Sequence, residues 1–173
     1  MPTPYHRPSL FNLFDLKEEI PRSYHQFRRA VFSNVPMYSL ADLDSIRKGA
    51  LSKLIAGYFE SSQTILFVHL YKVWPSGEIP ELFRRIRQSQ GLMQSLYECP
   101  GELIGPEETD YLLCQTACCL YNCWDFSLCS TDRRLRLYAT HDDELLWCSD
   151  DSDEHAMIEQ NLRDFGLLRV NMP

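Results

Sequence analysis

The stretch from Trp124 to Glu154 constrains the fold of this chain more than any other part. Apolar and polar residues alternate over 124–129 and again over 134–139, with a short polar turn between them. Alternation with a period of two is typical of a strand with one face in a core and the other in water. A second turn at 141–143 leads to the apolar run 145–147. The stretch predicts a three-stranded antiparallel meander, with Trp124 in the core and Trp147 at least partly buried.

The other periodic segments predict an α+β fold. The nearly continuous apolar run TILFVHLYKV, at 64–73, is typical of a strand covered on both faces and central in a sheet. Spacings of three and four predict helices over 39–59, from Pro80 to Gly91, and from the capping residue Ser152, with Met157 inward, to Gly166. We expect an antiparallel or mixed sheet with helices packed mainly on one face. For the helix at 39–59, the expected cap is Ser39 and the expected inward residues are Leu40, Leu43, Ile46, Ala50, Leu54 and Tyr58.

Four segments are less strongly determined by the sequence. The segment 9–20 predicts a short helix that ends before Pro21, whereas 22–32 fits a helix or an edge strand equally well. The segment 98–109 contains two prolines and two glycines and predicts a long loop. The apolar segment 111–121 fits a buried strand or a buried helix; its continuity with the meander slightly favours a strand.

Length and hydropathy indicate one compact domain, residues 1–173. A chain of 173 residues that is 45% hydrophobic buries about two-thirds of its unfolded surface. No stretch approaches the roughly 18 apolar residues that cross a bilayer, and the N-terminus lacks the apolar core of a signal peptide. We therefore expect a cytoplasmic protein that does not bind membranes.

Negative charge is concentrated in one short segment. The formal net charge is -7, and seven acids but no Lys or Arg lie between positions 142 and 154. The other 17 acidic residues equal the 17 basic ones in number. Such a segment repels nucleic acid and favours a basic partner or a cation, although a solvated corner is the common alternative. The candidate partner-binding residues are Asp142, Asp143, Glu144, Asp150, Asp151, Asp153 and Glu154.

The seven cysteines predict free thiols without a metal. An odd number of cysteines in a chain with no secretion signal argues against a disulfide framework. The spacing in CQTACCLYNC, with no histidine nearby, does not favour zinc. Buried free cysteines pack as small hydrophobic residues, so we expect most thiols to be unreactive. We expect neither a metal nor another cofactor.

No common catalytic signature is present, and three weaker candidates remain. The cluster His141-Asp142-Asp143 has the groups of a metal-dependent hydrolase, but adjacent residues on a tight turn point in different directions. Cys118 or Cys119 could act as a nucleophile with His141 as base, yet nothing nearby lowers a thiol pKa. His69, inside a buried strand, fits a hydrogen-bonded structural role better than a catalytic one. We therefore expect no catalytic residues.

The order of features also carries a family resemblance. A helical N-terminal half, a buried strand, the hairpin TDRRLRLYATHDDELLW and the closing helix DEHAMIEQNL resemble small acidic immunity proteins of bacterial polymorphic-toxin systems. The resemblance covers about the last third of the chain. It implies a cytoplasmic inhibitor that binds and occludes a basic toxin or effector domain through an acidic surface. The alternative from another class is the metal-dependent hydrolase that uses His141, Asp142 and Asp143.

Overall fold

The computed structural model describes residues 2–5, 32, 35–69, 81–94 and 101–170. Its strands are β1 Thr3–Tyr5, β2 Met37–Ser39, β3 Thr64–Val68, β4 Gly101–Ile104, β5 Phe126–Ser130, β6 Leu135–Ala139, β7 Glu144–Ser149 and β8 Arg169–Val170. They form one eight-stranded sheet in the order β1-β4-β3-β5-β6-β7-β2-β8. Every neighbouring pair is antiparallel. The predicted α+β class is confirmed.

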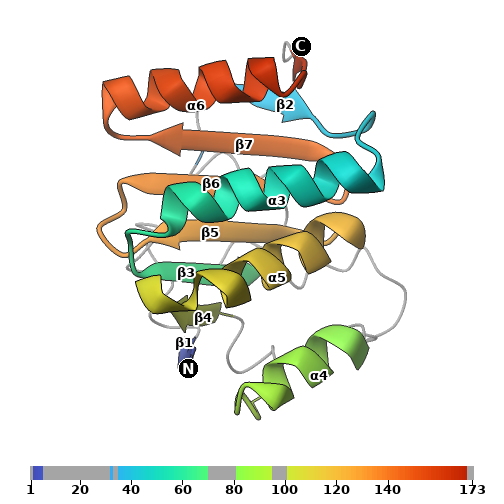
Figure 1. Cartoon of the computed structure of the whole chain (residues 1–173), viewed down its shortest axis with the longest axis vertical. Coiled ribbons are helices and arrows are strands. Elements are labelled where there is room, and N and C mark those ends of the chain that lie inside the picture. Colours follow the sequence, from blue (N-terminus) through green and yellow to red (C-terminus); the bar gives the residue numbers. More distant parts are fainter. Residues whose placement is uncertain (1, 6–31, 33–34, 70–80, 95–100, 171–173) are drawn as a thin grey trace.

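Helices cover one face of this sheet. They are α3 Ser45–Phe59, α4 Glu81–Ser89, α5 Thr109–Tyr121 and α6 Ser152–Asp164, with a short 3-10 helix, η1, at Pro106–Glu108. Figure 1 shows α3, α5 and α6 in front of the strands, with α4 below them. Because α3 and α6 run in opposite directions across the sheet, their N-termini lie on opposite sides of the molecule (Figure 1). Within the described part of the chain, no helix is both long enough and apolar enough to cross a membrane.

The meander lies in the middle of the sheet as the sequence predicts. Leu128 of β5 pairs with Leu137 of β6, and Leu137 pairs with Trp147 of β7. All three side chains point into the core beneath the helices. Trp124 is 6% exposed and Trp147 is 1% exposed, so both predictions of burial are confirmed.

The other face of the meander is also buried, which corrects the expectation that it meets water. Ser127, Cys129 and Tyr138 are fully buried on that side. Phe32 stacks on Tyr138 with 5.9 Å between ring centroids, and these two residues belong to a second apolar cluster. Strict alternation indicates which residues share a face, but distant segments of the chain decide whether a face is covered.

The start of α3 differs from the prediction. Ser39 ends β2 because it pairs with Glu144 of β7, and the helix is capped five residues later by Asp44, which accepts a 2.8 Å hydrogen bond from the Arg47 N–H. Because the helix begins later than expected, Ile46 does not face the core. Its side chain is 83% exposed instead of buried.

Two further segments correct the sequence interpretation. The predicted loop at 98–109 contains strand β4 and helix η1, because β4 pairs with β3. The segment 111–121 belongs to helix α5 rather than to a strand, and its apolar side packs against α3. Both faces of a buried helix can be apolar, so periodicity did not distinguish the two states.

The remaining predictions are confirmed in part. Helix α4 ends before Gly91, which has φ +80°, and α6 ends before Gly166, which has φ +83°. The cap of α6 is Asp151 rather than Ser152, and Met157 is 57% exposed rather than inward.

Strand β3 covers 64–68 and is an interior strand. The predictions for 9–20, for 22–31 and for 70–73 lie outside the described residues.

A buried ion pair attaches α4 to the sheet. Arg87 Nε lies 2.6 Å from Glu102 Oε1, and the two residues are 2% and 1% exposed. The Tyr111 hydroxyl donates a 2.7 Å hydrogen bond to the other Glu102 oxygen and accepts one of 2.7 Å from Gln115. Burial raises the Glu102 pKa, whereas Tyr111 and Arg87 oppose that shift. The network connects α4, β4 and α5, and we assign it a structural role.

Candidate binding surface

Strand β7 divides the predicted acidic segment into two clusters. Asp142 and Asp143 precede β7 and Glu144 begins it, whereas the other four acids follow it. Six strand residues span roughly 20 Å, so the structure does not bring the seven acids together. We call Asp42, Asp44, Asp142, Asp143 and Glu144 the α3 corner, because they surround the N-terminus of α3. We call Asp150, Asp151, Asp153 and Glu154 the α6 corner, because they surround the N-terminus of α6.

The acids of the α6 corner are mostly used by the fold. Glu154 pairs with Arg134 and accepts a 2.5 Å hydrogen bond from Ser149 Oγ. Asp150 pairs with Arg136, which lies on the neighbouring strand β6. Two of the four acids at this corner are therefore compensated, because Arg134, just before β6, and Arg136, within β6, lie beside the end of β7.

The two remaining acids of the α6 corner lie at the helix N-terminus. Asp151 Oδ1 accepts hydrogen bonds from the backbone N–H groups of Asp153 and Glu154, at 3.0 and 2.9 Å. Asp153 has no ion pair within the described part of the chain. Acidic residues in the first helical turn are stabilised by the helix dipole. This corner thus has a sufficient structural explanation.

The α3 corner is assembled from two distant turns. The Leu40 N–H donates a 2.7 Å hydrogen bond to the Asp143 carbonyl oxygen, which joins the turn before α3 to the turn between β6 and β7. Thr140 Oγ1 accepts hydrogen bonds from the N–H groups of Asp142 and Glu144, at 3.2 and 3.3 Å. Asp42 and Asp44 therefore join the corner although about a hundred positions separate them from Asp142. No local pattern in the sequence predicts this neighbourhood.

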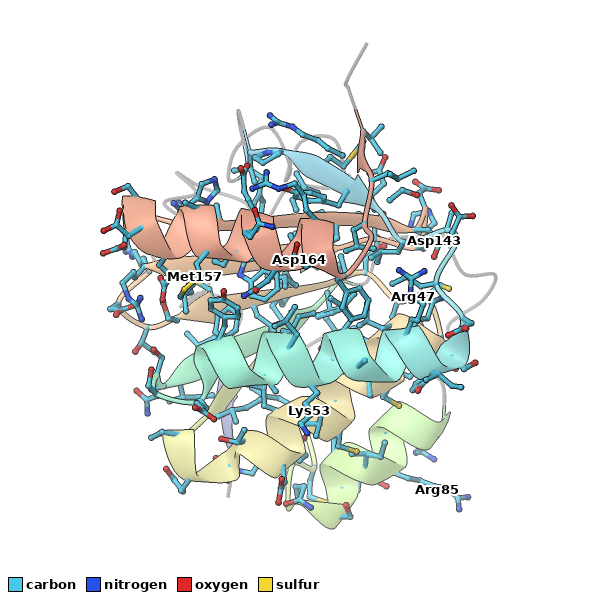
Figure 2. The ribbon with its side chains drawn as sticks, turned by 45° about the horizontal axis from the view of Figure 1, so that its top comes forward. Arg47, Lys53, Arg85, Asp143, Met157 and Asp164 are labelled. Carbon is cyan, nitrogen blue, oxygen red and sulfur yellow. The ribbon has the colours of Figure 1, made fainter. Side chains whose placement is uncertain are left out.

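Of the two cations near the α3 corner, Arg47 is engaged elsewhere, and Lys48 is only loosely paired with an acid of the corner. Arg47 donates a 2.5 Å hydrogen bond to the Phe165 carbonyl oxygen and lies over the Phe165 ring, 5.5 Å from its centroid. Lys48 Nζ lies 3.8 Å from Asp143 Oδ1, near the limit for an ion pair, and 3.7 Å from Cys123 Sγ. Figure 2 shows Arg47 and Asp143 on the same side of the molecule.

Two acids of the α3 corner are both exposed and free of Lys and Arg. Asp42 is exposed and has no ion-pair partner among the described residues. The Asp142 side chain is 58% exposed, and the side chain beside it in the described chain is that of His141, whose Nε2 lies 3.4 Å from Asp142 Oδ1. The charge of this corner is consequently less compensated than that of the α6 corner.

His141 is held by a buried carboxylate that the sequence interpretation missed. Its Nδ1 lies 2.8 Å from Asp125 Oδ1, which also accepts a 2.6 Å hydrogen bond from the His141 backbone N–H. Asp125 is 5% exposed; burial raises its pKa, and the hydrogen bonds to His141 oppose the shift. The alternation over 124–129 had placed Asp125 on a face in water, so its burial gave no signal in the sequence.

The residues of the alternative hydrolase do not converge on one point. His141 is bonded to Asp125, and Asp143 lies toward Lys48. Over residues 2–5, 32, 35–69, 81–94 and 101–170, no group of three His, Cys, Asp or Glu residues could hold a metal ion. The arrangement is that of a histidine at a turn whose ring is held in one orientation by Asp125.

The thiols and His69 lie in apolar surroundings. Burial raises the pKa of Cys118 and, more strongly, that of Cys119, so neither thiol is activated as a nucleophile. The six described cysteines are free, and Cys99 lies outside the described residues.

His69 is 6% exposed, its Nε2 lies 2.5 Å from Ser127 Oγ, and burial lowers its pKa well below 6.5. The predicted structural role of His69 agrees with this geometry.

An exposed apolar side chain lies next to the α3 corner. Ile46 occupies the first turn of α3, between Asp44 and the inward-turned Arg47, and is 83% exposed. Tyr121, at the end of α5, is 47% exposed and donates a 2.8 Å hydrogen bond to the Ser45 carbonyl oxygen. The corner thus combines carboxylates with exposed apolar surface.

No protein family, curated protein or solved structure matches this chain.

Proposed function

We propose that this protein is a non-enzymatic inhibitor of the immunity type, which binds a basic toxin or effector domain in the cytoplasm and occludes it. The observation that carries the proposal is the α3 corner, where five acids lie near two cations: Arg47 is committed to Phe165, and Lys48 is only loosely paired, 3.8 Å from Asp143. Like charges held together repel one another, and a basic surface relieves that repulsion when it binds. Nucleic acid is disfavoured as a partner because its phosphates meet the same repulsion.

Inhibition by occlusion requires only a rigid complementary surface. The α3 corner is fixed to the sheet by the hydrogen bond between Leu40 and Asp143 and by the pairing of β2 with β7. Such a surface loses little conformational freedom on binding, which favours affinity. Electrostatic attraction also raises the association rate, an advantage for an inhibitor that must reach its target quickly.

The proposal is tested by reconstitution of a complex from two purified proteins. Crosslinking in the native host followed by mass spectrometry supplies candidate partners, and each basic candidate is then purified separately. We expect a stoichiometric complex, loss of the partner's own activity as this protein is added, and weaker association at higher salt. Catalytic turnover of the partner, or a complex indifferent to salt, would contradict the proposal.

A further inference from the structure

We infer that the α3 corner is the docking surface, that Ile46 is its apolar anchor, and that its occupant is a protein segment with an apolar side chain flanked by Lys or Arg. The inference rests on the proposed function and makes it specific. It selects one of two acidic corners, adds the binding residues Asp42, Asp44 and Ile46, and states the chemistry of the partner.

Ile46 exposes an apolar side chain at the start of α3. Its 83% exposure is the highest among the exposed large hydrophobic residues of the described chain, whereas Leu51 and Ile55 on the same helix are fully buried and Leu54 is half-buried. A single exposed apolar residue is ordinary on a protein surface. Ile46 is distinguished from such residues by its neighbours, which are a partly exposed tyrosine and several carboxylates.

Tyr121 extends the apolar surface beside Ile46. A Cβ at Gly49 would lie 2.8 Å from the Tyr121 hydroxyl oxygen, so the tyrosine lies directly against α3 where glycine leaves room. Ile46 and Gly49 are three residues apart on α3 and therefore neighbours on its surface. Ile46 and Tyr121 thus expose carbon atoms at the same end of the helix layer, where α3 begins and α5 ends (Figure 1).

Carboxylates lie on the two turns that meet at the start of α3. Asp42 and Asp44 precede Ile46 on the chain, and Asp142 and Asp143 approach from the turn between β6 and β7. Binding sites commonly have an apolar anchor at the centre and polar or charged residues around it. The sign of the charges selects a cationic partner, and the central isoleucine selects one that also presents an apolar side chain.

The α6 corner supplies a control within the same molecule. Met157 is 57% exposed on α6 and lies on the side of the molecule opposite Asp143 (Figure 2). Of the acids nearby, Glu154 and Asp150 are paired with Arg134 and Arg136, and Asp151 caps the helix. An exposed methionine beside compensated charges lacks the complementarity that we assign to Ile46.

The test uses the full-length protein labelled with 15N and a synthetic peptide that carries one leucine between lysines. A second peptide has serine in place of the leucine. We expect the leucine peptide to shift amide signals of residues 42–49, 121 and 142–144 and to bind more tightly than the serine peptide. The variant Ile46→Ser should bind the leucine peptide about tenfold more weakly, as expected for loss of one buried aliphatic contact. The matched variant Met157→Ser should stay within about twofold of the wild type.

The outcomes separate this inference from the proposed function. If the peptide binds but shifts the α6 corner, or if Ile46→Ser and Met157→Ser bind alike, the docking surface is wrong and an acidic binding protein is still supported. If neither peptide binds and no purified basic protein forms a complex, both proposals fail. If Ile46→Ser instead abolishes self-association of the free protein, the occupant is a second copy of this chain and the inference is overturned.

Discussion

The two acidic corners have similar composition and different surroundings. At the α6 corner, Arg134 and Arg136 of the meander pair with Glu154 and Asp150, and Asp151 caps the helix. At the α3 corner, Arg47 turns toward Phe165, and Lys48 reaches Asp143 only at 3.8 Å. Most acids of the α6 corner therefore serve the fold. At the α3 corner Asp44 caps a helix as well, but Asp42 and Asp142 leave a negative surface near an exposed isoleucine.

This difference shows why a count of charges does not locate a binding surface. The segment 142–154 contains no Lys or Arg, so all its acids look equally uncompensated in the sequence. The meander changes this by placing Arg134, just before β6, and Arg136, within β6, beside one end of β7 and not beside the other. Compensation across strands, rather than along the chain, decides which acids remain available to a partner.

The largest expected effect comes from the strand that separates the corners. Trp147, at 1% exposure, packs against Tyr58 with 5.0 Å between ring centroids. The substitution Trp147→Ala should lower the free energy of unfolding by about 3–5 kcal/mol, because it leaves a large cavity in the core. Denaturant unfolding measures this, with the exposed Met157→Ala as control. A change below about 1 kcal/mol would contradict the placement of β7 as the rigid spacer.

Substitution of one acid in each corner should change stability by a smaller amount, and more at the α6 corner than at the α3 corner. Asp151→Ala removes the acceptor for two backbone N–H groups of α6 and should cost about 1 kcal/mol of stability. Asp142→Ala at the α3 corner should change stability by less than about 0.5 kcal/mol, since its side chain is 58% exposed. Thermal unfolding of both variants provides the comparison. Equal losses would mean that both corners serve the fold alike.

Double-mutant cycles should show stronger ion pairing at the α6 corner. Arg134 and Glu154 are in close contact, and Ser149 also bonds to Glu154. We expect a coupling energy of about 0.5–1 kcal/mol for Arg134 with Glu154, because both side chains are partly screened by water. For Lys48 with Asp143, at 3.8 Å, we expect about 0–0.3 kcal/mol. A larger coupling for Lys48 would mean that the α3 corner is already neutralised.

The smallest effects concern two carboxyl groups at opposite ends of the meander. A hydrogen bond from Ser130 holds the pKa of Asp132 below 3.8, so its contribution to stability is present above that value and is lost as the pH falls through its folded pKa. Burial holds the pKa of Asp125 above 3.8, so its contribution is greatest below that value and is lost as the pH rises through its folded pKa. NMR titration of side-chain carboxyl carbons should give Asp132 the lower pKa. The reverse order would contradict the described environments.

Much of the fold could be predicted from strong local patterns. Alternation identified β5, β6 and the core position of Trp124, and apolar residues at helical spacing followed by Gly91 or Gly166 identified α4 and α6. The start of α3 could not be predicted in this way, because Ser39 is a good cap locally but pairs with Glu144 in the sheet. Likewise, β4 forms in a loop-like sequence because β3 offers it a partner.

The candidate site was harder to predict than the fold. The acids 142–144 were identified from charge alone, but Asp42 and Asp44 join them only through the turn contact between Leu40 and Asp143. Ile46 was expected to be buried, since the periodic pattern was continued too far toward Ser39. Binding surfaces built from separate turns leave no spacing rule in the sequence, whereas a helix face does.

The central claim is that the α3 corner steers a basic partner, and association kinetics test it most directly. Two triple variants lose equal charge: Asp42→Asn with Asp142→Asn and Asp143→Asn at the α3 corner, and Asp150→Asn with Asp153→Asn and Glu154→Gln at the α6 corner. Stopped-flow association with the reconstituted basic partner is measured over a range of salt concentrations, since screening acts beyond about 8 Å at physiological salt. The account predicts that the α3 variant associates severalfold more slowly and with a flatter salt dependence, whereas the α6 variant stays near the wild-type rate. Equal slowing by both variants, or slowing by the α6 variant alone, would contradict it.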